Sequence, residues 1–117
     1  MAMEEVQVSR QGSLAVLDIR GYVTKTSGVP MKTAFAGLDP AVYRSVLFRF
    51  DKETYVNSEG IKTIIDLLLE AGQAGQRVGI TGVSDHFEKI FGMVGITKLT
   101  RIYKTEEEAV QDLTPEG

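Results

Sequence analysis

The chain has 117 residues, enough to bury a core, and its length predicts a single domain over residues 1–117 with a core at about 4–113. It has no cysteine and one histidine, a composition that excludes disulfides, thiolate chemistry and a histidine-rich metal site. The net charge of −3, with acidic and basic residues interspersed, argues against nucleic acid as the main partner and favours a protein partner.

The start of the chain carries no recognisable secretory signal. Residues Met1 to Glu5 are acidic, and no apolar stretch follows them, whereas a signal peptide has a basic and then an apolar region. Charged residues interrupt every long apolar run, so no segment reaches the length of a membrane span. We therefore expect a cytoplasmic protein without a membrane span.

The first elements are predicted to form a β-hairpin. Val6 and Val8 alternate with polar residues, and the apolar run of residues 14–19 follows a turn-forming cluster at Arg10-Gln11-Gly12-Ser13. Residues 21–30 are rich in Gly, Thr and Ser and favour neither a helix nor a strand.

The middle of the chain alternates helix and strand patterns. Residues 31–38 fit a short helix with Pro30 near its first position. Residues 46–50 form an apolar run that is typical of a buried central strand. Residues 58–71 predict the longest helix, because apolar residues recur there at positions i, i+3, i+4 and i+7.

Two strands and two helices are predicted in the last third. Residues 77–81 fit a strand, and Ser84 fits the N-cap of a helix. Residues 99–103 fit another strand, and Thr105 opens a capping-box pattern at the start of a final helix. The helix that follows Ser84 is expected to face the core with Phe87, Ile90, Phe91 and Val94.

This order of elements predicts an α/β fold with a mixed, mostly parallel sheet. The two initial strands are joined by a tight turn and should pair antiparallel, whereas strands that are joined through helices should run parallel. We expect the helices to cover mainly one face of the sheet.

The most informative segment is Tyr55-Val56-Asn57-Ser58-Glu59-Gly60-Ile61, where the chain enters its longest helix. Ser58 falls in the first turn, where unpaired N–H groups and the positive end of the helix dipole favour negative charge. A phosphate bound to Ser58, or carried by it, would meet little electrostatic resistance there. The other interpretation is a helix cap, in which Asn57 or Ser58 accepts an N–H from the next turn and stabilises the helix by about 1 kcal/mol. Spacing alone favours the cap.

The search for catalytic groups gives weak candidates. Ser58 has only His86 as an imidazole base and lacks a Gly-x-Ser-x-Gly elbow, so a hydrolase would need the fold to bring these two side chains within hydrogen-bond reach. We expect His86 to lie exposed near a helix start. Asp51, Lys52 and Glu53 follow the central strand, where open α/β sheets bind ligands, but they fit a charged loop better. We therefore expect no enzymatic activity, no cofactor and no metal site.

One apolar stretch leaves two interpretations open. Met93-Val94-Gly95-Ile96, together with Phe91, can be part of the core or can form an exposed apolar edge. The core is the default expectation.

The Ser58 turn and the order of elements resemble the STAS domain, the family of bacterial anti-sigma factor antagonists and of the cytoplasmic tails of sulphate transporters. In antagonists a central strand leads into an Asp-Ser-Ser/Thr-Gly-Leu/Ile turn that starts the longest helix. The resemblance covers nearly the whole chain, and the matching stretches are Asn57-Ser58-Glu59-Gly60-Ile61, Val78-Gly79-Ile80, the helix with Phe87, Ile90 and Phe91, Val94-Gly95-Ile96, and the helix with Glu107 and Ala109.

The resemblance implies a non-catalytic partner-switching module. In this scheme the unmodified antagonist binds an anti-sigma factor that is also a serine kinase, the kinase phosphorylates the serine that matches Ser58, and a phosphatase restores the hydroxyl. The resemblance places the partner-binding residues at Asn57, Ser58, Glu59 and Gly60. It adds Thr24, where the family carries an acidic residue after its second strand.

The chain departs from the family pattern at the turn itself. Asn57 stands where antagonists have an aspartate, which removes one charge, and Glu59 stands where they have serine or threonine, which adds one. The alternative function is therefore a STAS module that binds a nucleotide, an anion or a lipid at the same turn, or that serves as a structural part of a larger signalling assembly.

Overall fold

A computed structural model describes residues 5–24 and 29–114. The acidic start of the chain, up to Glu4, and residues 25–28 of the Gly, Thr and Ser-rich stretch lie outside the described residues. The elements are β1 (Glu5–Gln11), β2 (Leu14–Arg20), β3 (Tyr22–Val23), α1 (Val29–Ala36), β4 (Ser45–Arg49), β5 (Tyr55–Val56), α2 (Ser58–Gln73), β6 (Arg77–Thr81), α3 (Asp85–Met93), the 3-10 turn η1 (Ile96–Lys98), β7 (Arg101–Tyr103) and α4 (Glu106–Leu113).

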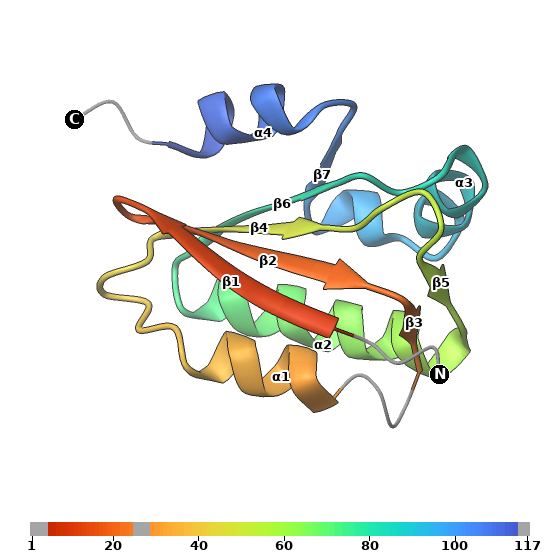
Figure 1. Cartoon of the computed structure of the whole chain (residues 1–117), viewed down its shortest axis with the longest axis horizontal. Coiled ribbons are helices and arrows are strands. Elements are labelled where there is room, and N and C mark those ends of the chain that lie inside the picture. The colour runs from red at the N-terminus through yellow and green to blue at the C-terminus, as the bar shows by residue number, and fades with distance from the viewer. Residues whose placement is uncertain (1–4, 25–28, 115–117) are drawn as a thin grey trace.

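The main sheet has five strands in the order β1-β2-β4-β6-β7 (Figure 1). The hairpin β1–β2 is antiparallel, and every other neighbouring pair in this sheet is parallel. Leu17 lies opposite Phe48, and Phe48 lies opposite Ile80, so apolar side chains form a continuous row across the centre. The predicted mixed, mostly parallel sheet is confirmed.

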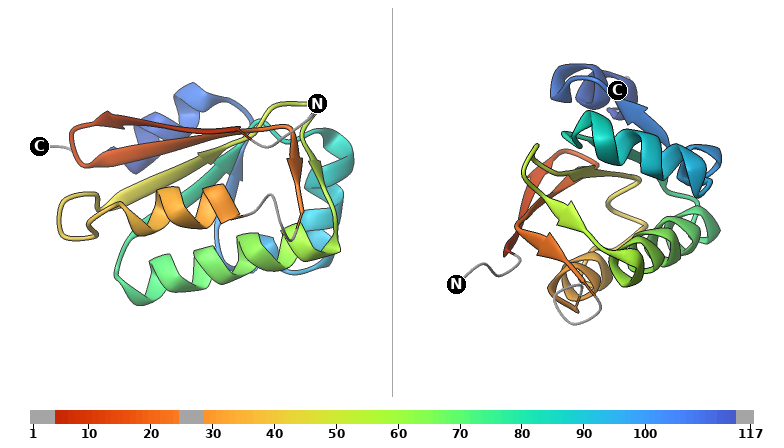
Figure 2. Two further views of the ribbon diagram at one scale, coloured as in Figure 1. Left: turned by 60° about the horizontal axis from the view of Figure 1, so that its bottom comes forward. Right: turned by 90° about the vertical axis from the view of Figure 1, so that its right-hand side faces the viewer.

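Helices cover both faces of the sheet unequally (Figures 1 and 2). Side chains of α1, α2 and α3 join one large core cluster on one face, together with every second residue of β2 and β4. On the other face, α4 covers a smaller cluster formed by Leu14, Val16, Leu47, Tyr103, Ala109 and Leu113. The expectation of helices mainly on one face is therefore correct for three of the four, and α4 is the exception because the opposite face of β2 and β4 is also apolar.

An ion-pair network fixes the start of α4 to the sheet. Arg49 at the end of β4 donates to Asp18 of β2 over 2.8 Å and to Glu106 of α4 over 2.6 Å. The hydrogen bond from Arg49 lowers the pKa of Asp18 below its ordinary value, and the bonds to Asp18 and then Glu106 raise the pKa of Arg49. Asp18 and Arg49 therefore stay charged at neutral pH, and the network joins β2, β4 and α4.

A separate ribbon of two short parallel strands leads into α2. Tyr22 of β3 lies opposite Tyr55 of β5, and Val23 lies opposite Val56. The backbone N–H of Tyr55 donates to the carbonyl of Gly21 over 3.2 Å, and that of Asn57 donates to the carbonyl of Val23 over 3.1 Å. Both valines are buried and both tyrosines are exposed. The ribbon lies at the end of the molecule where α2 begins (Figure 2).

The first turn of α2 packs directly on the backbone of β3. A Cβ atom placed on Gly60 would lie 2.1 Å from the carbonyl oxygen of Val23 and 3.0 Å from the side chain of Val56. Glycine is therefore the residue that allows the helix to approach this strand.

Two sequence expectations about the core are wrong at the end of α3. Phe87 and Phe91 are buried as expected, but Val94 is 46% exposed and Met93 is 84% exposed. The helix ends at Met93 and Gly95 follows with φ of +90°, so the helical period cannot be extended to Val94. The Met93-Val94 stretch is thus an exposed apolar edge, whereas Ile96 is buried.

The predicted helix boundaries and strands otherwise agree closely with the structure. Ser84 and Thr105 are the N-caps of α3 and α4, and each hydroxyl accepts a backbone N–H. The last strand begins at Arg101 rather than at residue 99, because η1 occupies the preceding residues. Within the described residues, no helix is both long and apolar enough to cross a membrane.

We predict that Gly60→Ala lowers the free energy of unfolding by about 3 kcal/mol, the upper end of the range for an overpacked site. The added methyl group would meet the backbone of Val23. Gly72→Ala in the same helix is the matched control, because a Cβ there meets nothing within 4 Å. It should leave stability unchanged or raise it by up to about 1 kcal/mol. Urea unfolding measures both variants, and equal effects would contradict the role of the close approach.

Candidate functional site

The start of α2 is capped by Asn57. This residue has an extended backbone, and its side-chain oxygen accepts the backbone N–H of Gly60 over 2.8 Å. The backbone carbonyl of Asn57 accepts the N–H of Ile61 over 2.9 Å. The sequence left open whether Asn57 or Ser58 caps the helix, and the structure assigns the cap to Asn57.

Ser58 is the first residue of α2 and is exposed. Because Asn57 already caps the helix, the cap requires nothing from the Ser58 hydroxyl, and no hydrogen bond joins this hydroxyl to any residue in the described part of the chain. The neighbouring Glu59 is exposed as well and is the acidic residue of the first turn. The hydroxyl therefore points into solvent at a helix terminus that favours added negative charge.

The candidate partner-binding residues lie together. Thr24 directly follows Val23, whose carbonyl accepts the N–H of Asn57, so the end of β3 lies beside the start of α2. Thr24 is half-buried, and Gly60 is buried beneath β3. The surface at this turn is therefore formed by Ser58, Glu59 and Thr24, with Asn57 half-buried between them.

The sequence reasoning missed two tyrosines beside this turn. Tyr22 and Tyr55 meet edge to face with ring centroids 6.0 Å apart, and Tyr55 meets Phe87 of α3 edge to face at 5.7 Å. Phe87 in turn contacts Phe91 at 6.2 Å in the core. The signal for this pair is the dipeptide Tyr-Val, which occurs twice and alternates an exposed with a buried residue.

The hydrolase interpretation requires a Ser58–His86 pair. His86 is exposed in the first turn of α3, as expected, and its ring packs against Phe87 with centroids 5.2 Å apart. Within the part of the chain that the structure describes, no hydrogen bond joins His86 to Ser58. The two side chains thus do not form a nucleophile and base pair.

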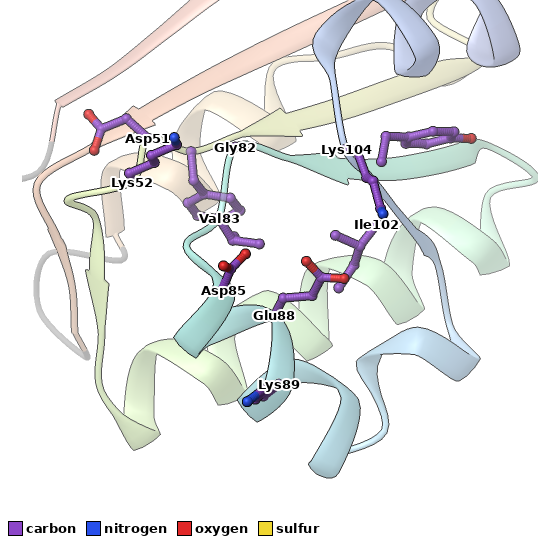
Figure 3. A pocket seen from close by; sticks show the side chains of 11 residues that line it. Asp51, Lys52, Gly82, Val83, Asp85, Glu88, Lys89, Ile102 and Lys104 are labelled. Atoms are coloured by element: carbon purple, nitrogen blue, oxygen red, sulfur yellow. The ribbon is translucent and has the colours of Figure 1, made fainter.

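A second candidate site is a cavity at the carboxyl ends of the parallel strands (Figure 3). It has a volume of about 910 Å³. The helix that follows β6, α3, packs on one face, whereas α4, which follows the last strand β7, packs on the other. Open α/β sheets commonly bind ligands outside the carboxyl ends of their strands. Its lining comprises Phe50, Asp51, Lys52, Gly82, Val83, Asp85, Glu88, Lys89, Ile102, Tyr103 and Lys104.

The charges around this cavity are mixed. Figure 3 shows Asp85 and Glu88 of α3 facing the same space as Lys104, whereas Lys89 turns away. Asp51 is used by the loop itself, because its carboxylate accepts the N–H of Glu53 over 2.8 Å and the hydroxyl of Thr54 over 3.2 Å. Asp51 therefore behaves as the charged-loop residue that the sequence favours. No group of three or more metal-ligating side chains gathers among the described residues.

Two substitutions separate the cap from the free hydroxyl. We predict that Asn57→Ala lowers the free energy of unfolding by about 1 kcal/mol, because Gly60 N–H loses its acceptor. Ser58→Ala should change it by no more than about 0.5 kcal/mol, as for an ordinary surface substitution. Chemical denaturation of both variants measures the difference. A larger loss in Ser58→Ala than in Asn57→Ala would show that the hydroxyl contributes to the fold.

Comparison with known proteins places this geometry in a family. The sequence matches the STAS domain over residues 4–109. No match is found among curated proteins. An anti-sigma factor antagonist from Mycobacterium paratuberculosis has a similar structure, with a TM-score of 0.81, 12% identity, and coverage of 96% of this chain and 95% of that chain.

Two further solved structures share the fold. The Bacillus cell fate determinant SpoIIAA in its phosphorylated form matches with a TM-score of 0.68 and 15% identity, covering 92% of this chain and 98% of that chain. The SulP transporter STAS domain from Vibrio cholerae matches with a TM-score of 0.68 and 17% identity, covering 89% of this chain and 83% of that one. At these identities the structures show the fold alone. Because the family match spans most of its length and the topology agrees with these structures, the chain belongs to the STAS domain family and has the fold of anti-sigma factor antagonists.

Proposed function

We propose that this chain is a non-catalytic signalling module that acts as an anti-sigma factor antagonist in the cytoplasm. Its Ser58 turn binds an anti-sigma serine kinase or a related regulator, and phosphorylation of Ser58 controls that binding. The observation that carries the proposal is the exposed Ser58 hydroxyl, which is free because Asn57 provides the helix cap.

The physical environment of Ser58 suits a reversible phosphate. A phosphoryl group adds about −1.5 to −2 charge at pH 7 and would stand at the positive end of the α2 dipole. Its attachment would break no hydrogen bond with any residue in the described ranges, because the hydroxyl makes none. The modification therefore changes the surface that a partner meets and leaves the fold intact, and a phosphatase can restore the first state.

The names of similar structures support the same function. The match from Mycobacterium paratuberculosis is an anti-sigma factor antagonist, and SpoIIAA of Bacillus has a phosphorylated form. Their sequence identity to this chain is low, so the proposal depends on the geometry at Ser58 and uses these proteins as precedents for the fold.

The departures from the family turn have separate consequences. Asn57 is as good a helix cap as aspartate, so the loss of the acid leaves the α2 start intact. Glu59 adds a carboxylate that is exposed one residue from Ser58, and Thr24 offers a hydroxyl in place of an acid on the neighbouring strand. A kinase that recognises this turn must accommodate a charge after the serine and needs no cation opposite Thr24.

The prediction is that the cognate anti-sigma kinase and ATP add one phosphate to the wild-type protein and none to Ser58→Ala. Ser84→Ala is the matched control, since Ser84 also stands at a helix start but its hydroxyl accepts the N–H of Phe87 over 3.2 Å. Intact-mass and peptide-mapping mass spectrometry identify the site. Phosphate that persists in Ser58→Ala, or a wild-type protein that stays unmodified, would exclude Ser58 as the regulated residue.

The alternative function is small-ligand binding, and the cavity between α3 and β7 favours it. Lys52 and Lys104 line this cavity from separate segments of the chain, beside the carboxylates of Asp85 and Glu88. By contrast, the depression beside the Ser58 turn is lined, within the described ranges, by Tyr22, Thr24 and Tyr55, none of which is charged. A nucleotide or an anion would therefore bind at the strand ends, and the proposed position at the turn is less suitable.

Calorimetric titration with ATP, GTP, phosphate and sulfate tests this alternative. If it is correct, one of these ligands should give saturable heat that persists in Ser58→Ala and is lost in Lys104→Ala. Saturable heat that is lost in Ser58→Ala but persists in Lys104→Ala would show that the ligand binds at the Ser58 turn. The absence of saturable heat with all four ligands would rule out binding of these compounds.

A further inference from the structure

We infer that Tyr22 and Tyr55 form the docking site for the kinase that acts on Ser58, and that the kinase presents an apolar side chain to the depression between them. This inference rests on the proposed function, because it names the chemistry by which that partner recognises the Ser58 turn. It assigns a role to two residues that lie outside the segment from Asn57 to Gly60.

The two tyrosines are more exposed than rings in contact with a core usually are. Tyr22 is 47% exposed and Tyr55 is 52% exposed. With Thr24 they line a shallow depression of about 370 Å³. Among the described residues no charged side chain contributes to its lining, so an apolar group that contacts these three side chains removes none of their atoms' ionic charge from water.

Both rings are held in position before any partner arrives. They meet each other edge to face at 6.0 Å, and Tyr55 also meets Phe87, which is buried. The valines that alternate with them, Val23 and Val56, are buried beneath the ribbon. The two rings therefore lose little conformational entropy when a partner covers them, and preorganised tyrosines are frequent hot spots of protein interfaces.

A kinase that reaches Ser58 must cover this pair. Tyr55 stands three positions before Ser58, so their Cα atoms are at most about 11 Å apart. A standard interface buries about 800 Å² on each partner, which corresponds to a patch that extends roughly 16 Å from its centre. A patch centred on Ser58 thus includes Tyr55 and the ring of Tyr22 that contacts it.

Position also decides between a kinase and a second copy of this chain. A second copy seated on the tyrosines would occupy the approach to Ser58 and would prevent its modification. One exposed apolar residue away from the turn serves as a comparison. Val42 is 52% exposed in the loop before β4, at the opposite end of that strand from the residues that lead to Ser58.

The test is steady-state phosphorylation of Ser58 by the cognate kinase with Tyr22→Ala, Tyr55→Ala and the double variant. Each single variant should raise KM for this protein by roughly 10-fold and leave kcat unchanged, because docking contacts are made equally in the ground and transition states. Val42→Ala, which removes a similarly exposed side chain, should change neither constant. Tyr55→Phe should keep the wild-type KM, because the ring contacts remain.

Two controls make each outcome decisive. Thermal unfolding checks that the ribbon is intact, and Tyr22→Glu replaces the ring with a charged group in the depression, so its KM should also rise. Wild-type KM in Tyr22→Ala and Tyr22→Glu would overturn the docking site while leaving Ser58 phosphorylation in place. A variant that changes sedimentation from dimer to monomer at unchanged KM would assign the pair to a second copy. No phosphorylation of the wild-type protein would overturn the proposed function, and this inference with it.

Discussion

The contact between the first turn of α2 and the backbone of β3 is the constraint on which the candidate site depends. Gly60 allows the helix to lie directly on the carbonyl of Val23, and the same carbonyl accepts the N–H of Asn57. This approach holds β3 beside β5, which brings Thr24 to the turn and brings Tyr22 against Tyr55. A side chain at position 60 would separate these elements, so one backbone contact sets both the direction of Ser58 and the shape of the surface around it.

The starts of α2, α3 and α4 use the same capping chemistry in two ways. In α3 and α4 a hydroxyl, from Ser84 or Thr105, accepts the backbone N–H three residues later and is thereby occupied. In α2 the amide oxygen of Asn57 accepts the N–H of Gly60, and the hydroxyl of Ser58, the next residue, is exposed. A phosphate on Ser84 or Thr105 would remove a cap that is worth about 1 kcal/mol, whereas a phosphate on Ser58 removes none. Because an amide is the cap of α2, Ser58 is the hydroxyl best suited to modification at the starts of α2, α3 and α4.

Local patterns predicted most of the fold, and what they missed depends on contacts between distant segments. The hairpin, β4, β6 and the capped helices follow from apolar periodicity and from polar residues at Ser84 and Thr105. Strands β3 and β5 have two residues each, too few for a periodic signal, and they pair across a long stretch of sequence. For the same reason the Tyr22–Tyr55 pair could not be found. The Ser58 turn was located from sequence. Asn57 and Ser58 are equally good caps, so only the folded structure shows that Asn57 accepts the N–H of Gly60.

In the proposed switch, surface charge changes while the scaffold stays the same. The described residues that line the depression at Tyr22 and Tyr55 are uncharged, and Glu59 places a single carboxylate in the adjoining first turn. Phosphorylation would change the charge of this turn from about −1 to about −3. It would also add a strongly hydrated group beside a surface that is desolvated when a partner binds. Because an apolar partner group gains free energy only when water leaves both surfaces, the phosphate opposes docking directly, without any movement of α2. The ribbon of β3 and β5 thus keeps the same conformation in the unmodified and in the phosphorylated protein, and only the charge of the surface differs between them.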